Sequence, residues 1–234
     1  MNKTGWTQLK IETNPAFDDD IMMHAAGYLE GALSQHEIFQ YSQSYFDSEF
    51  HGSKPPKELT DFIHENDAWT RQQSKANPND PFWRHVQLVL VQLDGLIAGY
   101  QATAPKNEYL SYSDIVIINL TGDLGVLLDA LVPGHAPDWH HMSAEDVTIA
   151  KMDREHCSSL VKVTDTFSDV FAAHTTWGGY QTMLRALKSY DIPLHASHTS
   201  AQKVVFSGYP ATLASDDDFY TTSAHLYVPS YSNR

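Results

Sequence analysis

Apolar residues recur at helical spacing through most of the first half of the chain. This periodicity predicts an amphipathic helix over residues 18–46, a second over 57–73 and a third over 82–100. Residues 109–131 are similarly apolar. Their β-branched centre, 115–118, would also fit a strand, but the length of the run and its leucines favour a helix. The first half of the chain is therefore predicted to be mainly helical.

The pattern changes after a loop rich in proline and histidine at residues 133–141. Shorter apolar runs then predict strands, at residues 147–150, 158–163, 169–174, 203–207 and 224–228. Between the third and fourth of these, a helix is expected to begin at Thr175 and to stop at Ile192-Pro193. Its expected apolar face comprises Trp177, Tyr180, Met183, Leu184 and Leu187. These elements predict an α+β fold, with a mainly helical part over residues 1–156 and a sheet-forming part over 157–234.

Three consecutive aspartates, Asp18 to Asp20, open the first predicted helix. Negative charge is favoured at a helix amino end, where backbone N–H groups are unpaired. A calcium site is the alternative, but the segment lacks the twelve-residue loop with its glycine and terminal glutamate. We therefore interpret the triplet as the start of the helix.

Composition and charge narrow the class of protein. With 42% hydrophobic residues the chain can bury a sizeable core. Fifteen basic residues against 29 acidic ones leave a net charge of −14, and no basic stripe gathers, so nucleic acid is not an expected partner. The longest uncharged apolar run, 115–122, is far shorter than the ~20 residues of a membrane helix, so no transmembrane segment is predicted.

The amino-terminal residues carry no secretory signal, which needs a basic, then an apolar, then a small-residue region. Two interpretations stay open. The protein stays in the cytoplasm, or the given start lies inside a longer precursor.

The single cysteine, Cys157, lies in the strand-like part of the chain. If residues 163–167 form a tight turn between two antiparallel strands, Cys157 lies opposite His174, close enough for a thiol and an imidazole to meet. A shift of the strand pairing by two residues would keep each side chain on the same face of the hairpin but would weaken the contact between Cys157 and His174. A thiol beside an imidazole is a candidate nucleophile. The alternative is a buried structural cysteine.

The segments around this cysteine closely resemble the phospholipase B-like family, also called lamina ancestor. The resemblance is carried by residues 156–163, 173–185 and 188–190. Further similar segments follow in the family's order and extend the resemblance over residues 5–220, at 5–6, 26–31, 93–95, 119–124, 206–210 and 217–220.

This resemblance implies an N-terminal nucleophile hydrolase, a four-layer αββα sandwich whose precursor is cut before a cysteine. Here that bond is His156-Cys157. The resemblance implies that Cys157 is the catalytic nucleophile, that its freed α-amino group is the base, and that His174 is a second catalytic-site residue. It also implies that Thr176 and Trp177 line the substrate pocket. No cofactor is expected.

The implied reaction is acyl transfer to water, with a lipid ester or an acyl amide as the substrate. A lysosomal or secreted location is implied, whereas the missing signal leaves the cytoplasm open. Family members are about twice as long as this chain, and their second half supplies further strands. The sandwich is therefore expected to be incomplete, and association with a missing C-terminal portion is expected. The competing hypothesis is a truncated, non-enzymatic binding or interaction protein.

Several other motifs have ordinary explanations beside functional ones. The histidine pairs His140-His141 and His195/His198 lack a zinc-binding pattern, so no metal site is predicted. Asn119 fits the glycosylation acceptor pattern but follows an apolar run, which favours burial.

Two further segments keep two interpretations each. The acidic residues 216–218 resemble a family segment, and their neutral interpretation is a solvated turn. Trp177 and Tyr180 would line an acyl pocket or form the core face of the predicted helix.

Overall fold

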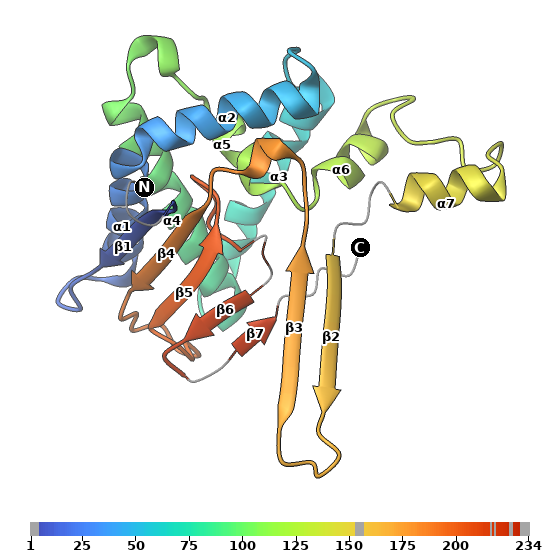
Figure 1. The fold of residues 1–234 in the computed structure, drawn as a ribbon. Coiled ribbons are helices and arrows are strands. Elements are labelled where there is room, and N and C mark those ends of the chain that lie inside the picture. Colours follow the sequence, from blue (N-terminus) through green and yellow to red (C-terminus); the bar gives the residue numbers. More distant parts are fainter. Residues whose placement is uncertain (1–4, 153–156, 216, 218, 225–226, 230–234) are drawn as a thin grey trace.

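The computed structural model describes residues 5–152, 157–215, 217, 219–224 and 227–229 (Figure 1). The α-helices are α1 (Asp19–Leu33), α2 (Gln35–Phe50), α3 (Lys57–Ala76), α4 (Pro81–Thr103), α5 (Tyr112–Asn119), α6 (Leu124–Leu131) and α7 (Ala144–Met152). The strands are β1 (Thr7–Glu12), β2 (Cys157–Val163), β3 (Val170–Thr176), β4 (Ala186–Asp191), β5 (Lys203–Gly208), β6 (Phe219–Thr222) and β7 (Tyr227–Pro229). Short 3₁₀ turns lie at η1 (Lys106–Glu108) and η2 (Tyr180–Thr182).

The strands form two separate sheets. Five of them are ordered β1-β4-β5-β6-β7, and β2 and β3 form a hairpin of their own. Strand β1 runs parallel to β4, pairing Thr7 with Ala186 through to Glu12 with Asp191, whereas the other neighbours are antiparallel. Strand β1 was not predicted. It adds an amino-terminal segment to a sheet whose other strands all lie after residue 185.

Helices α1 and α4 cover one face of the five-stranded sheet (Figure 1). Alternate residues of β1 and β4 point to the helices and are buried, whereas the residues between them are more exposed. This period of two is typical of a sheet with one covered face. The core at this face comprises Leu9, Ile11, Met22, Met23, Ala26, Leu88, Tyr190, Ile192 and Phe206.

The two covering helices touch backbone to backbone through glycines. A Cβ atom added at Gly27 of α1 would lie 1.9 Å from the carbonyl oxygen of Gln92, and one at Gly95 of α4 would lie 2.1 Å from that of His24. Any larger side chain would therefore force the helices apart.

A second core lies among α2, α3, α4, α5 and α6. Its fully buried side chains include three tyrosines, of which Tyr41 stacks on Tyr45 and on Tyr209. The two cores together account for the strong apolar periodicity of the first half of the chain.

A buried ion pair fastens α1 to the sheet. The Lys188 Nζ lies 2.7 Å from Glu30 Oε1, and both side chains are only 1% exposed. Lys188 also donates to the Thr212 carbonyl, and the Tyr190 hydroxyl donates to the second Glu30 oxygen. Burial raises the pKa of Tyr190 well above its ordinary value, and the Glu30 carboxylate adds to the rise. The network satisfies charges that would otherwise be costly to bury.

The helices of the first half are confirmed, but two of the long ones are interrupted. The single helix predicted over 18–46 is wrong, because Ser34 leaves the helical conformation, with ψ near 15°, between α1 and α2. The helix predicted over 109–131 likewise divides into α5 and α6. Asn119 turns its side chain to the 211–213 segment at this break.

The predicted strand over 147–150 and the predicted helix over 175–192 are both wrong. Residues 147–150 lie inside α7. Strand β3 continues to Thr176, and residues 186–191 form β4, where pairing with β1 on one side and β5 on the other supplies backbone hydrogen-bond partners. Trp177, Tyr180, Met183 and Leu187 are exposed and form no common core face. Strand pairing between distant segments therefore outweighs the local period.

The strands predicted over 158–163, 169–174 and 203–207 are confirmed as β2, β3 and β5. Of the strand predicted over 224–228, residues 225 and 226 lie outside the described residues, and β7 begins at Tyr227. The α+β class is confirmed. The four-layer sandwich stays a prediction, as does the division of the chain at residue 156.

Candidate functional site

The β2–β3 hairpin carries the predicted site residues, and its register differs from the expected one by two residues. Cys157 pairs with Thr176, and Ser159 pairs with His174. The predicted pairing of Cys157 with His174 is therefore wrong. His174 is instead the diagonal neighbour of position 157, and such neighbours are about 7–8 Å apart in an antiparallel pair.

The loop between the strands explains the slip. It spans residues 164–169, and Thr164 holds it closed at its base. The Thr164 N–H donates to the Asp169 carbonyl at 3.1 Å, and its hydroxyl oxygen accepts from the N–H groups of Ser168 and Asp169, each at 3.1 Å. Phe167 adopts the left-handed conformation that closes the turn, with φ of 54°. This loop is longer than the tight turn expected, so the pairing moves by two residues and the faces are preserved.

The structure places His174 and Thr176 next to each other at the end of β3. Both are half-buried, and the His174 Nδ1 lies 3.5 Å from the Thr176 hydroxyl. Trp177 follows and is 49% exposed. His156 lies outside the described residues, and of Cys157 the structure describes the backbone pairing in β2.

A second segment of the chain meets the hairpin at His174. The His174 Nδ1 lies 3.2 Å from the main-chain carbonyl oxygen of Asp217. The Asp217 side chain points away from solvent and is only 10% exposed. One of its oxygens accepts from the Arg185 guanidinium and the other from the Ser207 hydroxyl. The interpretation of residues 216–218 as a solvated turn is therefore wrong at Asp217.

Arg185 is held from several sides. Its Nη1 donates to the Tyr209 hydroxyl at 2.8 Å. The centre of the guanidinium lies 4.8 Å from the Tyr209 ring centroid and 5.7 Å from that of Trp6. A cation over aromatic faces gains electrostatic attraction and loses rotational freedom. The group Arg185, Ser207, Tyr209 and Asp217 is thus a rigid polar support beneath the carboxyl end of β3.

Sequence reasoning missed this support. Arg185 falls within the helix predicted over residues 175–192, but in the structure it lies directly before β4. Its partner Asp217 is 32 residues away in the chain, so no local spacing connects them. The resemblance of residues 173–185, 206–210 and 217–220 to family segments was the signal that included these residues, but it did not connect them to one another.

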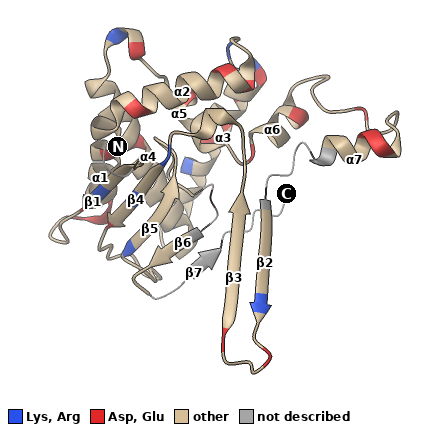
Figure 2. Ribbon diagram, in the orientation of Figure 1, with Lys and Arg blue, Asp and Glu red and all other residues tan. Residues whose placement is uncertain are grey.

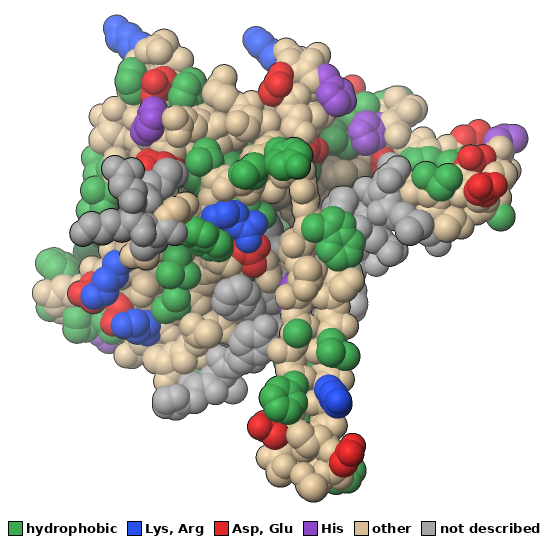
Figure 3. Space-filling view, in the orientation of Figure 1, with side chains coloured by type: hydrophobic (Ala, Val, Ile, Leu, Met, Phe, Trp, Pro, Cys, Tyr) green, Lys and Arg blue, Asp and Glu red, His purple; other side chains and the backbone are tan. Residues whose placement is uncertain are grey.

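The hairpin itself projects from the rest of the molecule with both faces open (Figure 1). Val161 and Val170 on one face are each 58% exposed, and Leu160 and Phe171 on the other are 61% and 60% exposed. Figure 3 shows apolar side chains along the face of the hairpin that is turned to the viewer. Its strands contain a single charged residue, Lys162 (Figure 2). A two-stranded hairpin with two apolar faces is marginally stable alone in water, so this surface fits a binding partner.

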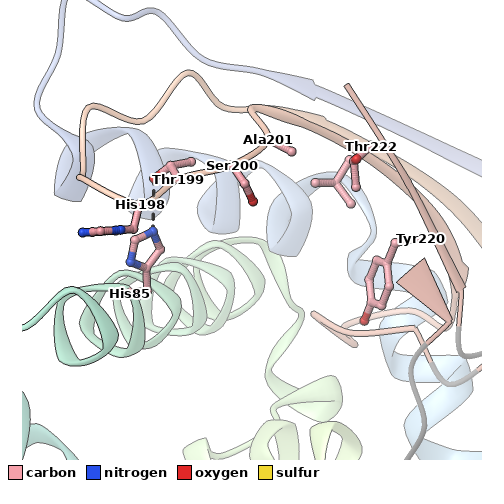
Figure 4. A pocket seen from close by; sticks show the side chains of 8 residues that line it. His85, His198, Thr199, Ser200, Ala201, Tyr220 and Thr222 are labelled. Carbon is pink, nitrogen blue, oxygen red and sulfur yellow. Dashed lines mark hydrogen bonds between the residues drawn. The ribbon is translucent and has the colours of Figure 1, made fainter. Parts of the chain in front are cut away.

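A separate pocket of about 380 Å³ lies between the amino end of α4 and the 198–201 loop (Figure 4). It is lined by His85, His198, Thr199, Ser200, Ala201, Val204, Tyr220 and Thr222. The His85 Nδ1 lies 2.7 Å from the Pro81 carbonyl oxygen and its Nε2 lies 3.1 Å from the Thr199 hydroxyl. These contacts hold the 198–201 loop on α4. The predicted site residues are not among those that line this pocket.

In each of the two histidine pairs considered as metal ligands, one histidine has a nearby carboxylate partner. The His141 Nδ1 lies 2.6 Å from Asp138 and the His195 Nδ1 lies 3.0 Å from Asp19. Among the residues that the structure describes, no group of three histidine, cysteine, aspartate or glutamate side chains could hold a metal ion.

Asn119 has a structural role. Its Nδ2 donates to the carbonyls of Ile115 and Ala211, both at 3.0 Å, and its Oδ1 accepts from the Leu213 N–H at 2.8 Å. Glycosylation of this residue stays a prediction, and a glycan would have to replace one of the two Nδ2 bonds.

Within the described parts of the chain, no helix is both long enough and apolar enough to span a membrane.

Comparison with known proteins identifies the family of this chain. The Phospholipase B family model matches residues 1–234. Phospholipase B-like protein B of Dictyostelium discoideum is 35% identical, over 100% of this chain and 41% of the relative. Phospholipase B-like 1 of Rattus norvegicus is 33% identical, over 100% of this chain and 42% of the relative. Phospholipase B of Crotalus adamanteus is 34% identical, over 100% of this chain and 43% of the relative. The chain thus spans less than half the length of these relatives.

Proposed function

Because this chain belongs to the phospholipase B family, we propose that it forms part of a hydrolase that cleaves acyl ester bonds of phospholipids or related lipids. The match over the whole chain is the observation that carries the proposal. An amide of a fatty acid is the second substrate class, since the same acyl chemistry would cleave it. A lysosomal or secreted location accompanies the proposal.

In the proposed mechanism, the bond between His156 and Cys157 is first cut, so that Cys157 becomes a chain terminus. Its α-amino group, with an ordinary pKa of about 7.7–8.0, accepts the thiol proton near neutral pH. The thiolate attacks the acyl carbonyl, the alcohol or amine leaves with a proton, and water hydrolyses the thioester. The position of this bond directly before β2 supports the proposal, because a new terminus there would be held by pairing with β3.

The neighbours of position 157 supply the remaining roles. His174 is the diagonal neighbour and Thr176 the directly paired residue. Trp177, which is half-exposed at the end of β3, offers an apolar ring to an acyl chain. We propose these three as site residues.

The exposed hairpin favours a further element of the proposal. Its two open apolar faces suit burial against a C-terminal portion such as the remaining length of the relatives would provide. The same surface is the observation that favours the second candidate function, a non-enzymatic binding protein.

Replacement of Cys157 tests the catalytic proposal. Cys157→Ala should abolish hydrolysis of a phosphatidylcholine substrate and capture of an acyl group, measured by fatty-acid release and by intact mass. Ser158→Ala, one residue along the same exposed strand, is the matched control and should retain both.

Retention of fatty-acid release in Cys157→Ala would contradict the assignment of the nucleophile. Absence of release and of acyl capture in the unaltered protein would favour the binding function.

A further inference from the structure

The group beneath the end of β3 has a function beyond joining two segments. We propose that Asp217, fixed by Arg185 and Ser207, is a positioning residue that sets the hydrogen-bonding form of His174. The inference rests on the proposed function only in treating His174 as a site residue. The arrangement of atoms stands independently of the reaction.

The contact between His174 and Asp217 is directional. A main-chain carbonyl oxygen can only accept a hydrogen bond, so a bond across the 3.2 Å to Nδ1 requires the hydrogen on Nδ1, and the Thr176 hydroxyl oxygen, 3.5 Å from Nδ1, can then also accept. In the neutral ring the Nε2 atom is then the one with the lone pair. Neutral imidazole in water prefers the opposite form, with the hydrogen on Nε2, so the Asp217 carbonyl selects the less common form of His174.

The carbonyl can do this because the residue that carries it is immobilised. The Asp217 carboxylate is nearly buried and binds the Arg185 guanidinium and the Ser207 hydroxyl. Arg185 is held in turn by Tyr209 and by the faces of two aromatic rings. Charge-assisted hydrogen bonds of this kind fix geometry as well as lower energy. The Asp217 side chain therefore acts as an anchor, and its main chain contacts the histidine.

This arrangement suits a site in which a thiol must be oriented. With the lone pair on Nε2, this nitrogen of His174 is the one that can accept a hydrogen bond from a thiol, a water or a substrate group. Fixing one ring form is how supporting residues orient catalytic histidines in general.

The test is nitrogen NMR of the histidine side chains at pH 8 in the full protein with ¹⁵N-labelled histidine. His174→Gln identifies the His174 signals. We expect His174 to carry its hydrogen on Nδ1 in the unaltered protein and on Nε2 in Asp217→Ala. Asp217→Asn, whose amide oxygen can accept from Arg185 and whose amide N–H can donate to the Ser207 hydroxyl oxygen, should keep the Nδ1 form. A His174 that carries its hydrogen on Nε2 in the unaltered protein, or an unchanged ring form in Asp217→Ala, would overturn the proposal.

Asp19→Ala is the matched control. Asp19 is also a buried carboxylate, and it binds the N–H and Nδ1 of His195 and lies 3.9 Å from Arg84. This variant should alter the His195 signals and leave those of His174 unchanged. A change of His174 in both variants would assign Asp217 a merely structural role and overturn the proposal.

Activity provides a separate measurement. Asp217→Ala should lower kcat for lipid-ester hydrolysis by about 10- to 100-fold with little change in KM, because a misplaced group costs rate more than binding. The NMR experiment locates the hydrogen on His174 without substrate. If the protein does not hydrolyse lipid esters, there is no activity to compare, and the NMR result alone tests the role of Asp217.

Discussion

The helix-covered sheet and the β2–β3 hairpin contain similar apolar residues, but these are buried in the sheet and exposed in the hairpin. In the first region Met22 and Phe206 are 1% and 2% exposed, whereas in the hairpin Leu160 and Phe171 are about 60% exposed. In both regions the strands are paired along their backbones. What differs is the second layer, because α1 and α4 cover the sheet and no described element covers the hairpin. Backbone pairing therefore forms a strand, and burial of its side chains needs a separate partner.

The largest expected effect concerns the ion pair that joins the two layers. Lys188→Met should lower the free energy of unfolding by about 3–5 kcal/mol, because it leaves the Glu30 carboxylate buried without its cation. Urea unfolding followed by circular dichroism measures the loss. Lys10→Met, which breaks an exposed pair with Glu12 on β1, should leave the midpoint unchanged.

An equal decrease in the free energy of unfolding in Lys188→Met and Lys10→Met would show that burial of the Lys188–Glu30 pair makes no difference to its contribution. Adding Glu30→Gln to Lys188→Met should recover part of the loss, because the uncompensated charge is removed.

A pair of leucine variants compares the two regions directly. Leu59→Ala removes a side chain that is fully buried in the helical core and should cost about 2–5 kcal/mol. Leu160→Ala, in the hairpin, should change the free energy of unfolding by less than about 0.5 kcal/mol. Thermal unfolding of both variants makes the comparison. A similar loss in Leu160→Ala would mean that the hairpin is covered in solution.

A more moderate destabilisation is expected at the contact between the covering helices. Gly27→Ala should destabilise the protein by about 1–3 kcal/mol, because its Cβ would collide with the Gln92 carbonyl. Gly125→Ala in α6 is the matched control. A Cβ there meets nothing within 4 Å, so this change should stabilise by up to about 1 kcal/mol. Chemical denaturation measures the free energy of unfolding of both variants. Destabilisation by Gly125→Ala but not by Gly27→Ala would contradict the close contact between α1 and α4.

The comparison also explains which elements could be predicted from the sequence. Helices such as α3 and α4 show their period locally, because one face meets a continuous core. Strand β4 could not be predicted, because its partners β1 and β5 determine it and β1 is about 180 residues away. The interruption at Ser34 was similarly hidden, since the apolar pattern continues across it.

The candidate site shows the same division. His174, Thr176 and Trp177 are close neighbours in the chain, so their proximity was accessible from sequence, although Thr176 and Trp177 were assigned to a helix rather than to the end of β3 and the residue after it. The predicted pairing of β2 with β3 differs from the observed one by two residues, because the hydroxyl of Thr164 stabilises a longer loop than the expected turn. The support formed by Arg185, Ser207 and Asp217 depends on contacts between distant segments, which only the folded chain brings together.

We propose that Cys157 becomes the terminus of a processed hydrolase. Denaturing intact-mass measurement of the protein from its native source tests it most directly. The account predicts two fragments that meet between His156 and Cys157, and a single uncut species for Cys157→Ala expressed in the same way. A single uncut species for the unaltered protein, or cutting that persists in Cys157→Ala, would contradict it.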